Sequence, residues 1–228
     1  MTDADVLFDG RSFAALLFDM DGTLLSSIEA AERVWTRWAA QFGIDAATFL
    51  PGIHGRRTIE SVRSLNIPGI DPEEQADAIT RAEMEDVAGI HVIPGAHEFL
   101  ASLPEDRWAI VTSAPRALAI RRLQAIDLRP PTVFITAEDI PKGKPDPACY
   151  HLAASQLGYK TDECVVFEDA AAGIQAGENA GAAVVVITAT HQHEIDTPHP
   201  TLKSYHSLRT MAAAAGNLKL ATANRSGM

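Results

Sequence analysis

Two aspartates, Asp19 and Asp21, are the first residues of this sequence whose types and spacing suit a catalytic or ligand-binding role. They follow an apolar run over residues 13–17 that is typical of a buried parallel strand, so both acids are expected where that strand ends. Ligands bind at the carboxyl ends of such strands, and side chains two positions apart on a strand point to the same side. The pair therefore suits joint work on one small anionic substrate. The alternative is that Asp21 and Gly22 only make a turn after the strand. Residues 8–10 contain a similar Asp-Gly step without a second acid, and we interpret that segment as a hairpin turn.

Two hydroxyls and a lysine follow later apolar runs. Thr112 and Ser113 come directly after residues 108–111, and hydroxyls at a strand-to-helix turn can hold phosphate oxygens. The alternative for both is an ordinary helix N-cap. Lys144 lies in the Gly-Lys-Pro step of a loop that two prolines and a glycine make rigid. Its neighbour Lys142 is assigned to the surface.

Glu168 and Asp169 end a third apolar run and complete a set of four acids with Asp19 and Asp21. They could simply cap the next helix, but four carboxylates at one sheet edge would repel each other and raise their pKa values unless a cation is present. Oxygen ligands select a hard divalent cation, so Mg²⁺ is the expected cofactor. With Asp21 protonated, three carboxylates, one Mg²⁺ and Lys144 sum to zero charge, which would let the site accept a phosphate dianion.

The elements that must position these residues are of two kinds. Helical spacing over residues 28–42, a short helix over 58–65 and a helix that begins after Asp71 predict an all-helical block. From residue 92 onward strands alternate with helices, which predicts an α/β fold with a doubly wound, Rossmann-like parallel sheet. The expected strands are 108–111, 132–135, 164–167 and a final one at 183–187, and the expected helices are 115–125, 149–157 and 170–180.

The helical block interrupts the α/β pattern directly after its first strand. We therefore predict a core of residues 1–23 and 92–228 with a small helical cap of residues 24–91 inserted into it. The alanine-rich tail from about residue 212 is expected to fray and to carry no chemistry.

Composition excludes several classes of function. The chain of 228 residues is 46% hydrophobic, with a mean hydropathy near zero, as in ordinary soluble proteins. A formal net charge of -11 argues against nucleic acid or acidic lipid as a partner. Two cysteines are too few for a disulfide framework, and no targeting or membrane-spanning segment is recognised. We expect a cytoplasmic protein that is a monomer or a weak dimer.

The ordered motifs resemble those of the haloacid dehalogenase superfamily, over roughly residues 13–190. They are the DxDGT segment at 19–23, the hydroxyl after the second strand, the Gly-Lys-Pro lysine, and Glu-Asp followed by AxxGI. Residues 54–58, 111–113 and 165–170 are most similar to the branch of sugar-phosphate and polyol-phosphate phosphatases, such as 2-deoxyglucose-6-phosphate and glycerol-phosphate phosphatases. The resemblance implies a fold like that of β-phosphoglucomutase and a phosphoric monoester hydrolase that acts through an aspartyl-phosphate.

The resemblance also implies a role for each core residue. Asp19 is the nucleophile, and Asp21 is the general acid and base. Mg²⁺ is held by Asp19, the backbone carbonyl of Asp21 and Asp169, with Glu168 at or behind the metal. Thr112, Ser113 and Lys144 are the residues that hold the phosphate oxygens.

Cap residues are expected to select the substrate. His54, Arg56 and Arg57 lie at the start of a cap helix, where cations do not suit the helix dipole, so we interpret them as substrate contacts. Glu29 in the first cap helix is a further candidate. The alternative for the three cations is a solvated helix end.

Two rival functions share the core motifs. A sugar phosphomutase of the β-phosphoglucomutase type would carry a histidine ten residues beyond the second acid, where this sequence has Ala31. A phosphosugar-sensing protein without activity would tolerate loss of Asp19 or Asp21, and both are present. Asp21 argues against a dehalogenase, and the absence of lysine from residues 24–91 argues against a phosphonate hydrolase.

Overall fold

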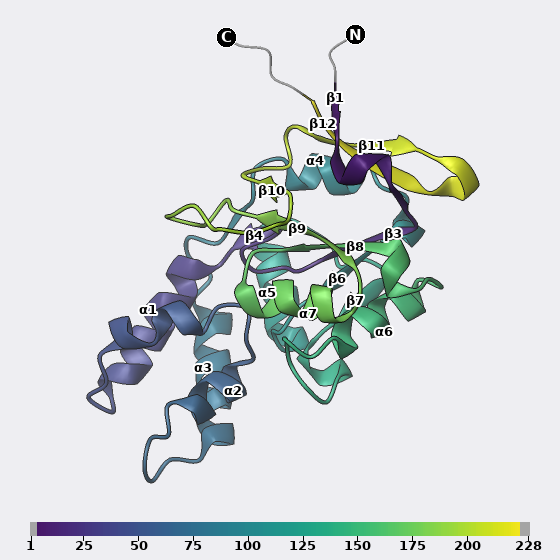
Figure 1. The fold of residues 1–228 in the computed structure, drawn as a ribbon. Helices are drawn as coiled ribbons and strands as arrows, with labels where there is room; N and C mark the ends of the chain where they lie inside the picture. Colours follow the sequence, from purple (N-terminus) through teal and green to yellow (C-terminus); the bar gives the residue numbers. More distant parts are fainter. Residues whose placement is uncertain (1–3, 224–228) are drawn as a thin grey trace, which may run out of the picture.

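The computed structural model describes residues 4–223 and is built around a parallel sheet (Figure 1). Its six strands run in the order β10-β9-β8-β3-β6-β7. Every pairing along this order is parallel, and β3 lies between β8 and β6, with Leu17 in register with both Val166 and Ala109. The bounds of the strands are β3 Ala15–Phe18, β6 Trp108–Val111, β7 Val133–Ile135, β8 Cys164–Glu168, β9 Ala183–Ile187 and β10 Thr201–Leu202.

Helices and a second sheet cover the two faces of this sheet. Alternate residues of β3 point to opposite faces: Leu17 packs with the helices α6 (Ala148–Gln156) and α7 (Ala171–Asn179), whereas Phe18 packs with α4 (Ala96–Ala101) and α5 (Arg116–Ala125). The α/β prediction is therefore confirmed.

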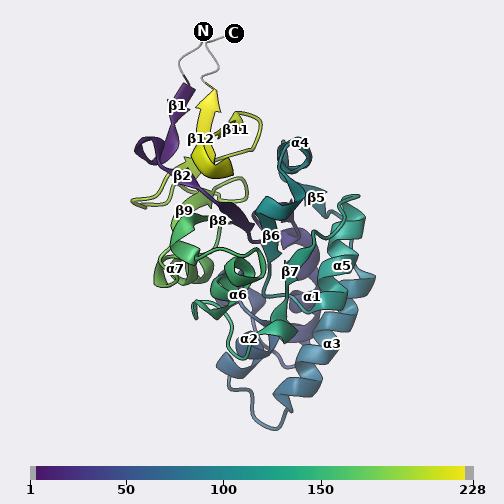
Figure 2. The same cartoon turned by 90° about the vertical axis from the view of Figure 1, so that its right-hand side faces the viewer.

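The helical block of residues 24–91 lies to one side of the sheet (Figure 2). Its helices are α1 (Ile28–Ala40), α2 (Thr58–Ser64) and α3 (Pro72–Glu85), and Asp71 caps α3 by accepting the backbone N–H of Glu73 at 2.9 Å. The block has a hydrophobic cluster of its own around Trp35, Trp38 and Ile79. It joins the rest of the chain through the antiparallel strands β4 (Leu25–Ser26) and β5 (His91–Val92).

The ends of the chain form a second sheet, and three sequence predictions are wrong here. As far as residue 223, the tail from residue 212 does not fray, because β12 (Leu218–Ala223) pairs with β11 (Leu208–Ala212) and buries Leu220. The rest of that prediction, for residues 224–228, lies outside the described residues. The strand at 183–187 is not the last. Residues 8–10 are not a hairpin turn: β1 (Ala4–Val6) and β2 (Ser12–Phe13) both pair with β12, and the chain between them makes one 3₁₀ turn.

Short 3₁₀ turns connect many of these elements. They are Leu7–Gly10, Ala46–Thr48, Leu50–Gly52, Glu105–Arg107, Ala137–Asp139, Thr161–Glu163 and Ala214–Gly216.

None of the helices described between residues 4 and 223 combines the length and the apolar character that a membrane span needs.

Candidate active site

The predicted core residues meet at the carboxyl ends of three neighbouring strands. Asp19 directly follows β3, Thr112 follows β6, and Glu168 is the last residue of β8, with Asp169 next to it. Since these strands are parallel neighbours, residues that are about 150 positions apart in the chain become adjacent. Lys144 reaches the same place from the loop that precedes α6.

Lys144 is buried between two carboxylates. Its Nζ lies 2.6 Å from Oδ1 of Asp19 and 2.7 Å from Oε1 of Glu168, and it also donates to the carbonyl of Val111 at 3.1 Å. Burial alone would lower the pKa of Lys144, but attraction to Asp19 and Glu168 outweighs it and holds the pKa well above its ordinary value. The lysine is therefore charged and held in place.

Glu168 is saturated with hydrogen-bond donors from the protein. Oε1 accepts the Tyr150 hydroxyl at 3.0 Å besides Lys144, and Oε2 accepts the backbone N–H groups of Asp169 at 3.0 Å and Ala170 at 3.1 Å. A side chain at Gly173 would come within 1.6 Å of Oε1, so only glycine fits there. Of the two predicted positions, at or behind a metal, this geometry suits the one behind it.

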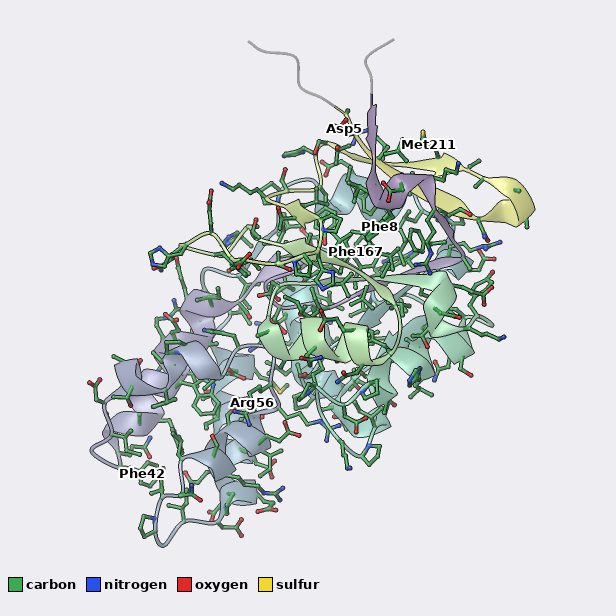
Figure 3. The ribbon with its side chains drawn as sticks, viewed as in Figure 1. Asp5, Phe8, Phe42, Arg56, Phe167 and Met211 are labelled. Atoms are coloured by element: carbon green, nitrogen blue, oxygen red, sulfur yellow. The ribbon has the colours of Figure 1, made fainter. Side chains whose placement is uncertain are left out.

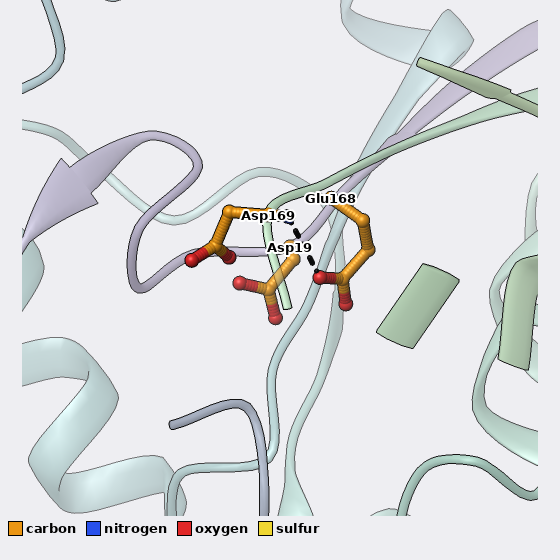
Figure 4. Close-up of side chains that lie close together, drawn as sticks. All are labelled: Asp19, Glu168 and Asp169. Carbon is orange, nitrogen blue, oxygen red and sulfur yellow. Dashed lines mark hydrogen bonds between the residues drawn. The ribbon is translucent and has the colours of Figure 1, made fainter. Parts of the chain in front are cut away.

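Asp19, Glu168 and Asp169 form an acidic cluster whose oxygens lie within 4.8 Å of one another (Figure 4). Burial, followed by repulsion from Glu168, raises the pKa values of Asp19 and Asp169 well above the ordinary range. A side chain at Gly22 would come within 2.0 Å of Oδ2 of Asp169, so the turn after Asp19 closes tightly on that carboxylate. Buried acids that repel each other and offer only oxygen fit a hard cation such as Mg²⁺.

Asp21 does not point toward this cluster, contrary to the expectation that it pairs with Asp19. Its Oδ1 accepts the Ser27 hydroxyl at 2.6 Å and lies 2.9 Å from Nη1 of Arg122. The strand ends at Phe18, and the chain then turns through Gly22 at φ +87°. Because Asp19 and Asp21 lie in a turn, the alternation of an extended strand does not apply to them.

The hydroxyls of Thr112 and Ser113 both have partners within the protein. Oγ1 of Thr112 accepts the backbone N–H of Ala114 at 3.1 Å, in the manner of a cap, and Oγ of Ser113 donates to the carbonyl of Gly55 at 2.9 Å. Both residues nevertheless line the same cavity as Asp19 and Asp21. The position of both is therefore compatible with phosphate binding, and Ser113 also contacts the helical block.

A cavity of about 70 Å³ lies between the strand ends and the helical block. His54 and Arg56 line it from the block, and Figure 3 shows Arg56 at the boundary between the block and the rest of the molecule. Nε2 of His54 lies 3.6 Å from Oε1 of Glu32.

Arg57 and Glu29 lie outside the cavity, so the structure does not support them as substrate contacts. The guanidinium of Arg57 donates to the carbonyls of Ile140 at 2.6 Å and Pro141 at 3.3 Å, so its side chain lies against the loop that carries Lys144. Glu29 packs against Gly89 at the base of the block.

Two charged residues of the cavity were missed from the sequence. Arg122 and Glu83 are 7% and 5% exposed and line the cavity. Each occupies a position on the apolar face of its helix: Arg122 follows the buried Leu118 by four residues, and Glu83 follows Ile79 by four. A charge at an apolar position of a helix was the signal that could have found them.

Comparisons with known proteins identify a family model and related phosphatases that the chain resembles. The model of the haloacid dehalogenase-like hydrolase family matches residues 13–181. Hexitol phosphatase A of Escherichia coli is 40% identical over 80% of this chain and 84% of its own. 2-Deoxyglucose-6-phosphate phosphatase 1 of Saccharomyces cerevisiae is 37% identical over 78% of this chain and 81% of its own.

A solved structure extends the likeness to the fold. β-Phosphoglucomutase from Clostridium difficile superimposes with a TM-score of 0.68 at 20% identity, over 77% of this chain and 84% of that one. At that identity the likeness shows the fold alone.

Proposed function

The chain belongs to the haloacid dehalogenase-like hydrolase family, and from this premise we propose that it is a Mg²⁺-dependent phosphatase of small sugar or polyol phosphates. The names of the related hexitol and 2-deoxyglucose-6-phosphate phosphatases support this substrate class. The observation that carries the proposal is the placement of Lys144 between Asp19 and Glu168, beside Asp169. This arrangement joins a carboxylate nucleophile, a fixed cation and an oxygen-rich cation site.

The proposed reaction has two steps, both centred on Asp19. A carboxylate oxygen of Asp19 attacks phosphorus, the P–O bond to the sugar breaks, and Asp21 gives its proton to the departing oxygen. Water then attacks the phosphorus of the aspartyl-phosphate, Asp21 takes the proton of that water, and the bond between phosphorus and the Asp19 oxygen breaks, which restores the Asp19 carboxylate and releases inorganic phosphate. Thr112, Ser113 and Lys144 hold the phosphate oxygens during both steps.

The proposed metal ligands are Asp19, the backbone carbonyl of Asp21, and Asp169. Mg²⁺ supplies positive charge that offsets the carboxylates and the phosphate. The raised pKa values of Asp19 and Asp169 support this assignment, because a nucleophilic carboxylate must be ionised and burial beside Glu168 opposes ionisation. Glu168 lies behind the proposed metal ligands and holds Lys144 through an ion pair.

We propose that residues 24–91 act as a cap over a core of residues 1–23 and 92–228. Gly55 supports this division, since it touches the core on two sides: its carbonyl accepts the Ser113 hydroxyl, and a side chain there would lie 2.5 Å from Cβ of Ala170. The cap thus closes the cavity next to Asp169. His54 and Arg56 are the proposed substrate contacts of the cap.

A cytoplasmic monomer or weak dimer, with no nucleic-acid or membrane partner, completes the proposal. The formal net charge of -11 supports the absence of polyanionic partners. Cys149 and Cys164 are both free and buried, and burial raises the pKa of their thiols to about 11 and about 12. Neither cysteine requires an oxidising compartment.

The experiment that tests this function is phosphate release from a panel of sugar and polyol phosphates with Mg²⁺. Turnover of at least one ester is expected, and it should be abolished in Asp19→Asn, which is nearly isosteric and keeps the fold. Mass spectrometry of acid-quenched wild-type protein should detect the phosphorylated Asp19. If Asp19→Asn kept more than a trace of the wild-type rate, the covalent mechanism would be wrong.

A separate measurement distinguishes the phosphomutase alternative. Ala31 lines the cavity where a mutase of this fold would carry a histidine, and its methyl group cannot transfer a proton. Glucose 1-phosphate with a bisphosphate primer should therefore give inorganic phosphate or nothing. Formation of glucose 6-phosphate at enzymic rates would favour the mutase.

A further inference from the structure

The cavity has an end, beyond Asp21, that the proposed reaction does not use. Arg122 of α5 and Glu83 of α3 lie there, with Nη1 of Arg122 2.9 Å from Oδ1 of Asp21 and Nη2 3.3 Å from Oε2 of Glu83. Figure 2 shows α3 and α5 side by side. The arginine therefore connects the proposed general acid in the core to a carboxylate in the cap.

Stability does not explain this pair. Ala31 and Leu118 line the same cavity and are apolar. Replacing a buried ion pair in such surroundings by apolar residues is often neutral or stabilising, because desolvation of the two charges offsets their attraction. Two charged groups kept inside a cavity that also contains Asp19 indicate a role toward a ligand.

The position of Arg122 and Glu83 indicates which part of the substrate they contact. The phosphoryl group binds at Asp19, and Asp21 protonates the oxygen that leaves, so groups beyond Asp21 face the leaving group. A guanidinium only donates hydrogen bonds and a carboxylate only accepts them, whereas each hydroxyl needs one partner of each kind. Arg122 and Glu83 together offer both within one short distance.

We propose that Arg122 and Glu83 form a subsite that binds hydroxyl groups of the leaving group and so selects polyhydroxylated phosphate esters. This inference rests on the proposed function and names the residues that select its substrate class. With Asp21 protonated for its role as general acid, Glu83 and Arg122 sum to zero charge, and Arg56, the other arginine of the cavity, is exposed to solvent that screens it. The subsite therefore favours neutral hydroxylated leaving groups over those that carry a second anion.

The test compares two esters that differ only in hydroxyls, glycerol 1-phosphate and n-propyl phosphate. Glu83→Met removes the acceptor at similar volume, and the ratio of kcat/KM for glycerol 1-phosphate to that for n-propyl phosphate should fall about 10- to 100-fold, as expected for a hydrogen bond to a charged group. Glu83→Gln retains an acceptor and should lose less of this ratio. Asp86→Asn is the matched control, because Asp86 pairs with Arg33 at 2.7 Å outside the cavity, and it should leave the ratio unchanged.

A second measurement uses a substrate whose leaving group carries a negative charge. For phosphoglycolate, whose leaving group carries a carboxylate, kcat/KM relative to glycerol 1-phosphate should rise in Glu83→Gln, since the variant removes the repelling charge and frees Arg122. An unchanged or lower ratio would overturn the placement of Glu83 beside the leaving group.

The outcomes separate this inference from the proposed function. If wild-type protein hydrolysed neither ester nor any other phosphate monoester, the proposed function would fail. If wild-type protein were active but Glu83→Met lost activity equally on both esters, the subsite would be wrong and the pair would serve cap closure. If Glu83→Met lost activity on neither ester, the subsite would be wrong and Glu83 would have no role in turnover. Should Glu83→Met not fold, Arg122→Lys, which keeps the charge but not the fork of donors, provides the same comparison of ratios.

Discussion

Nζ of Lys144 lies 2.6 Å from Oδ1 of Asp19, although the two residues are 125 positions apart in the chain. This contact joins the proposed nucleophile to the loop whose backbone carbonyls Arg57, at the start of α2, contacts.

Lys144→Met should destabilise the protein and reduce turnover. Removing one partner of a buried ion pair costs about 3 to 5 kcal/mol, because Asp19 and Glu168 would then face each other unneutralised. Loss of a preorganised phosphate ligand should lower kcat about 100-fold or more. Chemical denaturation and phosphate release measure the two effects, and Lys142→Met, on an exposed side chain two positions away, should change neither.

Mg²⁺ should stabilise the folded protein, and EDTA should abolish turnover. A ligand that binds only the folded state at 100 times its Kd adds about 2.7 kcal/mol, so the Tm should rise as Mg²⁺ is added. The rise should vanish in Asp169→Asn and persist in Asp77→Asn, which changes an exposed acid of α3. Full turnover in metal-free buffer would contradict the charge argument.

The stability of the metal-free protein should depend on pH through Asp169. Burial and repulsion from Glu168 raise the pKa of Asp169 in the folded state, whereas in the unfolded chain an aspartate titrates near about 3.9. Between these two values the folded state binds more protons, so stability falls as pH rises through that window. In EDTA, the Tm of the wild type should fall more than that of Asp169→Asn as the pH is raised from about 4. Parallel curves of Tm against pH for the two proteins would show that the pKa of Asp169 is not raised in the folded state.

His54→Ala and Arg56→Ala should change discrimination between substrates. A lost hydrogen bond to a substrate hydroxyl costs roughly 0.5 to 1.5 kcal/mol, or up to about 3 with a charged donor. The ratio of kcat/KM for the preferred sugar phosphate to that for p-nitrophenyl phosphate should therefore fall about 2- to 100-fold. Equal losses on both esters would assign these residues to cap closure, and no change would assign them to a solvated helix end.

Arg57→Met should lower activity without regard to the leaving group. Arg57 donates to the carbonyls of Ile140 and Pro141, and its neighbour Glu60 accepts the N–H of Gly143 at 3.2 Å, so α2 holds the loop that carries Lys144. Its loss should reduce kcat/KM about 2- to 100-fold on sugar phosphates and p-nitrophenyl phosphate alike. Arg63→Met on the same helix removes an exposed pair with Glu73 and serves as the control. A selective loss in Arg57→Met would return this residue to the substrate contacts.

The amino-acid sequence by itself determined the alternation of strands and helices from Trp108 to Ile187, the helical block after Leu24, and the order of the motifs. These features depend on local periodicity, on turn residues and on the rule that parallel strands bring their carboxyl ends together, so neighbouring residues carry the information. The proximity of Asp19 to Glu168 and Asp169 follows from the same rule.

Only the tertiary structure decided which partner each side chain finds. Leu220 lies in a buried strand because the two ends of the chain pair with each other, and no local pattern records a pairing across more than 200 residues. Arg57 contacts the lysine loop, and Asp21 contacts Arg122, because the direction of a side chain depends on elements from elsewhere in the chain. Arg122 and Glu83 show the limit most clearly: the helix pattern could mark each as a charge on an apolar face, but only the packing of α3 against α5 shows that both are buried beside Asp21.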